Sequence, residues 1–264
     1  MSATPADTAT ARTGELEIDR LSVAFGGVVA VDELSIAVPK GTIRAIIGPN
    51  GAGKTTLLNC ISGLVRATGG TVRFDGRDIT HTAAWKRSAA GIGRTFQNPS
   101  LADGLTVVEN VEVGLFAEGG SSPLEDALTT RRSRRNARQT RERSLSALAE
   151  LGIERYADLE VGTLPVGTRK LVDLARAWVL KPPLMLIDEP TAGLGEEEIA
   201  GVDAVLSTVR GHSTIVVIAH HLDFVMNLAD EVTVLNFGKE VITGLPLEVS
   251  ESPEVMDVYI GSAD

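Results

Sequence analysis

Cysteine is almost absent from this 264-residue chain, because Cys60 stands alone and cannot form an internal disulfide. The four histidines, at positions 81, 212, 220 and 221, show no zinc-binding spacing with it. No run of about 18 apolar residues occurs, so we expect no transmembrane helix. Basic residues are in deficit, and the net charge of −10 argues against a broad surface for binding nucleic acid.

Composition and length favour a folded globular protein of one large domain or two smaller ones. Apolar residues make up 43% of the chain and charged residues 23%, which is a usual globular mixture. Residues 1–14 are rich in Ala, Thr, Ser and Pro without hydrophobic periodicity, so we predict a loose tail. They also lack the basic and apolar regions of a signal peptide, so we expect a cytoplasmic protein.

Short apolar segments alternate with helical patterns, which predicts an α/β fold. The segments LEIDRLSVAF, LSIAV and TIRAIIG indicate strands of a mixed sheet, and TVRFDGRDI indicates a hairpin. The segments PPLMLIDEP and STIVVIAH are typical of central strands covered on both faces. Helical spacing relates Leu57, Leu58, Ile61 and Leu64, and also Val255, Val258 and Tyr259 near the end, which predicts a terminal helix packed on the core.

A phosphate-binding loop is predicted at Gly48–Thr55, where GPNGAGKT matches G-x-x-x-x-G-K-[ST] between a strand and a helix. In such a loop, backbone N–H groups surround phosphate oxygens at the positive end of the helix. Lys54 is expected to reach the β- and γ-phosphates, and the Thr55 hydroxyl to bind Mg²⁺. The alternative is an ordinary glycine turn.

Two carboxylates follow a buried strand in LMLIDE and predict the second half of the site. Asp188 is suited to bind magnesium, directly or through water. Glu189 lies one residue further on, where a carboxylate could orient and help deprotonate a water that attacks the γ-phosphate. A pair of helix-capping carboxylates is the alternative interpretation.

The segments GPNGAGKTTLLNCISGL, GIGRTFQNPSLADGLTVVENV, LPVGTRKLVDLARAW, LMLIDEPTAGL and VVIAHHLDFVMNLADEVTVLNFG occur in this order. In them the chain resembles the ATP-binding cassette (ABC) family, and within it the ATPases of branched-chain amino acid importers, over about residues 15–261. The resemblance implies a P-loop NTPase (RecA-like) core with an antiparallel β subdomain. It also implies that residues 15–264 form one nucleotide-binding domain, with a helical subdomain inserted at about 86–180.

The resemblance also assigns roles to single residues. Gln97 is implied to contact magnesium and the attacking water, and His220 to contact the γ-phosphate; His221 is the alternative if the register slips by one residue. Phe25 stands where the family stacks an aromatic ring on adenine, with a core phenylalanine as the alternative. The family signature, Leu-Ser-Gly-Gly-Gln, is here Leu-Pro-Val-Gly-Thr at 164–168. The implied nucleotide contacts are Phe25, Asn50, Gly51, Ala52, Gly53, Lys54, Thr55, Thr56, Leu164, Pro165 and Gly167; the implied magnesium contacts are Thr55, Gln97 and Asp188.

The implied function is that of the ATP-hydrolysing subunit of an importer of branched-chain or related amino acids, bound to the inner face of the membrane. Its implied partners are permease subunits, a second ABC ATPase subunit in a homo- or heterodimer and, indirectly, a periplasmic or lipoprotein solute-binding protein. An ABC exporter, a urea importer and a soluble non-transport ABC ATPase remain alternatives. The last is disfavoured by the negative charge and by the short interval between Gln97 and Leu164.

Three features have no assigned chemistry. The seven arginines within RRSRRNARQTRER indicate either a solvated helix face or a surface that binds anionic lipid headgroups. Trp85 and Trp178 are expected in the core, and Cys60 is expected to be a small buried apolar residue.

Overall fold

The computed structural model describes residues 15–116 and 131–260, so the predicted tail at 1–14 lies outside the described residues. The N-terminal part forms a four-stranded antiparallel sheet in the order β2-β1-β4-β5. Its strands are β1 (Leu16–Phe25), β2 (Val28–Val38), β4 (Gly69–Phe74) and β5 (Arg77–Asp78). Gly26 and Gly27, both with positive φ, turn the chain between β1 and β2.

A second sheet of six strands has the order β10-β9-β3-β8-β7-β6. Its strands are β3 (Ile43–Ile47), β6 (Ile92–Arg94), β7 (Leu184–Asp188), β8 (Thr214–Ile218), β9 (Glu231–Asn236) and β10 (Lys239–Gly244). All neighbours pair in parallel except β9 and β10. The expectation that TIRAIIG shares a sheet with the two preceding strands is therefore wrong, since β3 is buried along its whole length and lies inside the parallel sheet.

The large sheet lies between two apolar cores, because successive side chains of a strand point to opposite faces. Ile46, Leu186 and Ile218 pack toward the antiparallel sheet and α1 (Lys54–Ser62). Ile47 and Ile187 pack toward the opposite face. That core includes residues of α6 (Val166–Trp178), α7 (Glu196–Val209), α8 (Leu222–Leu228), α9 (Pro246–Ser250) and α10 (Pro253–Ile260). The predicted terminal helix is confirmed, with Val255 buried in this core.

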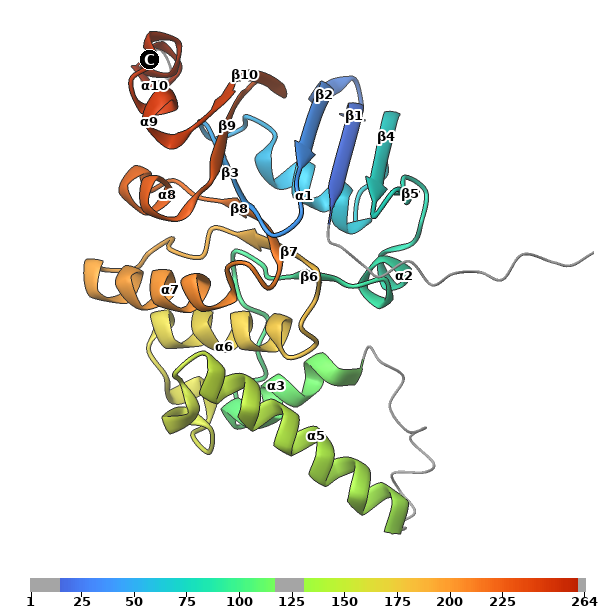
Figure 1. Cartoon of the computed structure of the whole chain (residues 1–264), viewed down its shortest axis with the longest axis vertical. Helices are drawn as coiled ribbons and strands as arrows, with labels where there is room; N and C mark the ends of the chain where they lie inside the picture. Colours follow the sequence, from blue (N-terminus) through green and yellow to red (C-terminus); the bar gives the residue numbers. More distant parts are fainter. Residues whose placement is uncertain (1–14, 117–130, 261–264) are drawn as a thin grey trace, which may run out of the picture.

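Two further helices and two short 3-10 turns gather at one end of the molecule, below the sheets in Figure 1. They are α3 (Val107–Leu115), α5 (Arg131–Glu150), Glu154–Tyr156 and Val161–Thr163. Helix α2 (Ala84–Ala89) lies instead against β6 and α1. Helices α3, α5 and α6 pack against one another, and α6 also packs against α7. Thr106 and Glu109 form a capping box that begins α3. Through α6 this helical group is joined to the large sheet.

Two expectations about apolar residues are wrong. Helix α1 ends at Ser62 and is capped by Gly63 in the left-handed conformation, so Leu64 lies beyond the helix and is exposed. Trp85 is 70% exposed, because in the short helix α2 the buried side chain is Arg87. Its guanidinium donates to the carbonyls of Cys60 and Ile61 at the end of α1. Cys60 and Trp178 are buried, as predicted.

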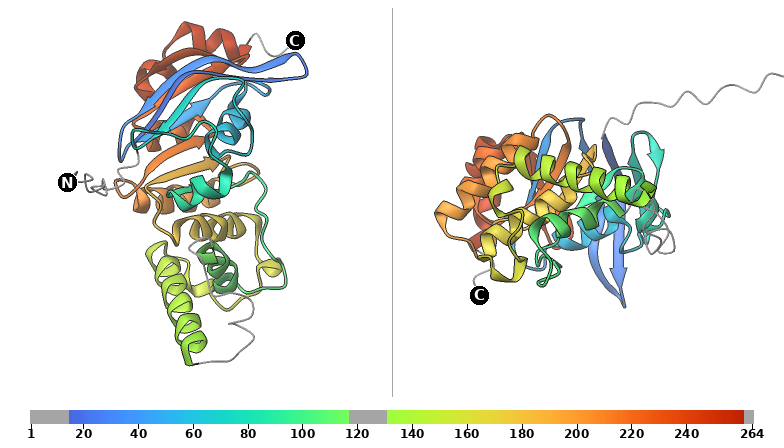
Figure 2. Two further views of the ribbon diagram at one scale, coloured as in Figure 1. Left: turned by 90° about the vertical axis from the view of Figure 1, so that its right-hand side faces the viewer. Right: turned by 90° about the horizontal axis from the view of Figure 1, so that it is seen from below.

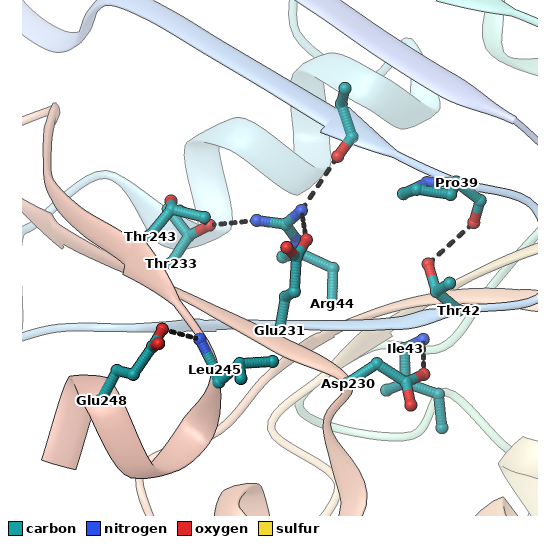
Figure 3. Close-up of polar contacts among 11 residues, drawn as sticks. Pro39, Thr42, Ile43, Arg44, Asp230, Glu231, Thr233, Thr243, Leu245 and Glu248 are labelled. Carbon is teal, nitrogen blue, oxygen red and sulfur yellow. Dashed lines mark hydrogen bonds and ion pairs between the residues drawn. The ribbon is translucent and has the colours of Figure 1, made fainter.

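A buried arginine joins the two sheets (Figure 3). Arg44 of β3 donates to the carbonyl oxygen of Ala37 in β2 at 2.9 Å and to the Thr233 hydroxyl of β9 at 3.1 Å. It also forms an ion pair with Glu231. Because a buried guanidinium needs partners for its donors, these contacts hold β2 against the large sheet. Neither stretch that the structure describes, 15–116 or 131–260, contains a helix long and apolar enough to cross a membrane.

Candidate functional site

The loop between β3 and α1 has a backbone that accepts only glycine at two points. A Cβ at Gly48 (φ +144°) would lie 2.1 Å from the Leu235 carbonyl oxygen, and one at Gly53 (φ +99°) would lie 2.2 Å from that of Ala30. Gly51 has nothing within 4 Å of such an atom, so the loop is open there. The loop is thus packed against β9 and β2 on one side and accessible on the other.

Lys54 is held inside this loop and not in solvent. Its Nζ donates to the carbonyl oxygens of Gly48 at 2.7 Å and Pro49 at 2.8 Å. Burial lowers the pKa of Lys54, and the nearby carboxylates of Glu189 and Asp188 oppose that shift. A buried ammonium held by two backbone carbonyl oxygens is positioned to exchange them for the oxygens of an anion in the loop.

Asp188, at the end of β7, is a buried carboxylate with an unsatisfied oxygen. Its Oδ2 lies 3.6 Å from Arg94 Nη2, while Oδ1 has no hydrogen-bond partner among the described residues. Burial raises the pKa of Asp188, and Arg94 acts in the opposite direction. Buried polar atoms usually have a bonding partner, and Mg²⁺ prefers oxygen ligands. A bound Mg²⁺ would therefore satisfy Oδ1 of Asp188. The predicted second magnesium contact, Thr55, is exposed in the first turn of α1.

Glu189 connects the elements that follow three different strands. Gln97 Nε2 donates to Glu189 Oε2 at 2.7 Å, and His220 Nε2 lies 2.6 Å from Glu189 Oε1. Its backbone has the left-handed φ of +48°, and Lys170 Nζ donates to its carbonyl oxygen at 2.9 Å. A non-glycine residue in this conformation is strained, and such strain is concentrated at functional sites. The structure therefore brings together three residues of which the first, Gln97, and the last, His220, are 123 positions apart in the chain.

The adjacent histidines are placed differently. His220 follows β8 and reaches Glu189, whereas His221 is the N-cap residue of α8. Two neighbouring residues at the end of a strand point in different directions, so only one of them can face the carboxylate.

The segment that begins α6 forms a separate part of the surface. Pro165 is the exposed N-cap of α6, Leu164 packs partly against the core, and Gly167 is buried. The Gly167 N–H donates to Glu198 Oε1 at 3.2 Å, and the Gly195 N–H donates to Glu198 Oε2 at 3.1 Å. Within the described residues, no hydrogen bond joins this segment to the phosphate loop.

The proposed base-binding residue is not part of the core. Phe25, at the end of β1, is 50% exposed, which excludes the alternative of a packed core phenylalanine. Asn50, Gly51 and Thr55 are exposed, whereas Ala52 is buried. The backbone N–H of Gly238, in the turn after β9, donates to the Ala52 carbonyl oxygen at 3.0 Å and holds the packed side of the loop.

Three residues of this region escaped the sequence interpretation. Arg94 pairs with Asp188, and Lys170 binds the backbone of Glu189. Tyr259 of α10 contacts the first glycine of the loop: burial raises the pKa of its hydroxyl, and a hydrogen bond with the Gly48 backbone opposes this shift. The position of Arg94, three residues before Gln97 in GRTFQ, could have indicated that it belongs to the site. Nothing in the sequence indicates the contact of Tyr259 with Gly48, since 211 positions separate the two residues.

The parallel strands β3, β6, β7 and β8 end at the same edge of the sheet. The phosphate loop follows β3, Gln97 follows β6, Asp188 and Glu189 lie at the end of β7, and His220 follows β8. This is the arrangement of a P-loop nucleoside triphosphatase. Residues 31–192 match the family model described as ABC transporter. The chain belongs to this family, and it is an ATP-binding cassette that hydrolyses ATP.

Relatives and solved structures agree with this membership. The high-affinity branched-chain amino acid transport ATP-binding protein BraF of Pseudomonas aeruginosa is 33% identical, over 94% of this chain and 98% of its own length. The corresponding protein LivG of Escherichia coli is 31% identical over the same shares. A crystal structure of an ATP-binding cassette in the ADP conformation has a TM-score of 0.80 at 32% identity, covering 93% of this chain and 98% of that chain. The predicted family and the α/β fold of an ABC ATPase are confirmed.

Proposed function

We propose that this chain is the ATP-hydrolysing subunit of a membrane importer of branched-chain amino acids. The transported solutes are carried over from the names of relatives such as BraF and LivG. The observation that supports the energetic role is the contact of one strained carboxylate, Glu189, with both Gln97 and His220 beside the phosphate loop.

In this proposal the loop and Lys54 bind the triphosphate. The N–H groups of residues 50–56 surround the phosphates, and Lys54 exchanges its carbonyl partners for the β- and γ-phosphate oxygens. Asp188, Thr55 and Gln97 would hold Mg²⁺, for which the Oδ1 of Asp188, unpaired among the described residues, is the supporting observation. The ion would supply positive charge that offsets the negative charge of the phosphates. Phe25 stacks on the adenine ring.

Hydrolysis depends on the carboxylate cluster. Glu189 orients a water molecule and accepts its proton as the water attacks the γ-phosphate. His220 and Gln97 each contact one oxygen of Glu189, and so they fix the direction in which the carboxylate points. Lys170 supports the strained backbone beneath it. These contacts hold the base in place before ATP arrives, which is the advantage of a preorganised site.

A second ATPase subunit completes the site. In a head-to-tail homo- or heterodimer, Leu164, Pro165 and Gly167 of one subunit cover the nucleotide of the other, and the N-terminal end of α6 directs its dipole toward the γ-phosphate. In the isolated chain this segment has no hydrogen bond to its own phosphate loop among the described residues, which supports an action on a neighbouring subunit.

The permease docks at an apolar groove beside Gln97. The groove is lined by residues that include Ser62, Leu64, Trp85, Arg87 and Phe96. Trp85, Leu64 and Phe96 are all exposed, which is costly for large apolar side chains unless a partner covers them. Because Phe96 directly precedes Gln97, a helix inserted here is coupled to the site of hydrolysis. This contact places the chain on the inner face of the membrane and links it indirectly to a solute-binding protein.

Uptake by cells tests this function. Removal of the gene should abolish high-affinity uptake of labelled leucine, isoleucine and valine, and the wild-type gene should restore it. Lys54→Ala, which removes the phosphate contact, should be produced at normal levels without restoring uptake. Normal uptake after removal of the gene would refute the assignment of solutes, and restoration by Lys54→Ala would refute the energetic role.

A further inference from the structure

The N-terminal half of α5 is the most basic part of the molecule. Residues 131–143 contain seven arginines and a single glutamate, in a chain whose net charge is −10. The chemistry assigned to the phosphate loop and the carboxylate cluster uses none of these arginines. Such a local reversal of charge creates a positive potential that attracts anions.

Three of these arginines are exposed and lie close together on the helix. Arg138 lies four residues after Arg134 and three after Arg135, and these helical spacings place the three side chains on one broad face. Arg138 pairs with Glu142 on the same helix at 2.8 Å and still exposes 83% of its side chain. Among the ion pairs of the described residues, none involves Arg134 or Arg135.

The other half of α5 is anchored, so the basic face is held in a fixed direction. Ala147 and Leu148 are buried in the core shared with α3 and α6. Arg141 pairs with Asp158 at 2.8 Å and marks the point at which the helix leaves the body of the protein. From there the N-terminal half extends outward, as Figure 1 and the left panel of Figure 2 show.

The N-terminal half of α5 points toward the side of the molecule that carries the permease groove. In Figure 1 and in the right panel of Figure 2, the N-terminal end of α5 lies on the same side of the molecule as α2, which carries Trp85 of the groove. Phe116, at the end of α3, is 65% exposed, and α3 packs against α5. Exposed aromatic and basic side chains on one side of a protein are typical of surfaces that lie in a membrane interface.

We propose that Arg134, Arg135 and Arg138 bind the anionic phospholipid headgroups of the inner leaflet while the permease occupies the groove at Trp85. The orientation of the surface rests on the proposed function, since the permease determines which side faces the membrane. Guanidinium groups bind phosphate oxygens in pairs of hydrogen bonds, and three of them on one helix face match a plane of headgroups. Nucleic acid is a poorer partner, because the rest of the chain is acidic and repels a long polyanion.

Vesicle binding by the purified full chain, measured by flotation without nucleotide, tests the proposal. The chain should float with vesicles of phosphatidylcholine and phosphatidylglycerol but not with phosphatidylcholine alone, and added salt should weaken the binding. Replacement of Arg134, Arg135 and Arg138 by Gln should reduce the partition coefficient about fivefold per arginine and roughly 100-fold in all. The matched control replaces three exposed arginines outside α2 and α5 by Gln and should bind as the wild type does; they are Arg20 in β1, Arg155 in a 3-10 turn and Arg210 at the end of α7.

ATP hydrolysis in solution separates this proposal from the proposed function. Both triple variants should hydrolyse ATP at the wild-type rate, which also shows that they fold. Equal binding to neutral and anionic vesicles, or an equal loss in the control variant, would overturn the lipid surface. So would tighter binding to an RNA oligonucleotide than to the anionic vesicles. A wild-type chain that binds these vesicles but does not hydrolyse ATP would instead refute the proposed catalytic role and leave the lipid surface intact.

Discussion

Replacement of Glu189 by Gln is the most direct test of the carboxylate cluster. The glutamine side chain has the same shape, but one of its two terminal atoms becomes an NH₂ donor. In the structure both carboxylate oxygens face side-chain nitrogens, Gln97 Nε2 at 2.7 Å and His220 Nε2 at 2.6 Å. At least one of these contacts therefore weakens, by about 1.5–3 kcal/mol for a hydrogen bond to a charged group.

The larger effect of this substitution is chemical. An amide cannot accept the proton of the attacking water, and loss of a general base lowers the rate by about 10²–10⁴-fold. ATP affinity should stay close to that of the wild type, because Lys54 and the loop amides are unchanged. Phosphate release at saturating ATP measures the rate, and titration with ATP measures the affinity. The variant should also accumulate as an ATP-bound dimer in gel filtration.

Glu197→Gln is the matched control. Glu197 is exposed in the first turn of α7, and its replacement by Gln changes the net charge by the same amount as Glu189→Gln does. Its turnover should equal that of the wild type. If Glu189→Gln hydrolyses ATP as fast as this control, Glu189 is not the base and the proposed role of the cluster is wrong. If ATP binding disappears together with turnover, the carboxylate acts in binding and not in the chemical step.

Three further substitutions test other parts of the site. Gly48→Ala should abolish ATP binding and destabilise the fold by at least about 3 kcal/mol in urea unfolding, because its Cβ would meet the rigid Leu235 carbonyl at 2.1 Å; normal affinity would contradict the tight packing of the loop. Phe25→Ala should weaken ATP binding by about 1–3 kcal/mol without changing its dependence on magnesium, and an unchanged Kd would remove the stacking role. His220→Ala should lose most hydrolysis while His221→Ala retains it, because only His220 reaches Glu189; the opposite outcome would shift the register by one residue.

Local patterns in the sequence were sufficient for the α/β class and for the phosphate loop. The motif at Gly48–Thr55 depends on a strand, a turn and a helix that are consecutive in the chain, and the structure has all three in this order. The same holds for Asp188, since a short continuous apolar run identifies a central strand and the carboxylate that follows it. Helix length was harder to predict, because the apolar period of α1 continues to Leu64 although Gly63 ends the helix.

Burial of single residues was less predictable where a helix is short. Trp85 was expected in the core, but α2 has only six residues and cannot bury two large side chains. Arg87 takes the buried position, since it donates to the carbonyl oxygens of Cys60 and Ile61 at the end of α1. The role of Arg44 in joining the two sheets was equally hidden, because its partners come from β2 and β9.

The identity and order of the chemical groups are thus properties of the sequence alone: the glycines and Lys54 of the loop, the carboxylates after β7 and the histidines after β8. Which of these groups touch was decided only by the tertiary structure, because parallel pairing brings the ends of distant strands to one edge of the sheet. That pairing places Gln97 and His220 in contact with Glu189, and within residues 15–116 and 131–260 one oxygen of Asp188 has no hydrogen-bond partner. Burial and strain arise from these long-range contacts, and neither can be read from neighbours in the chain.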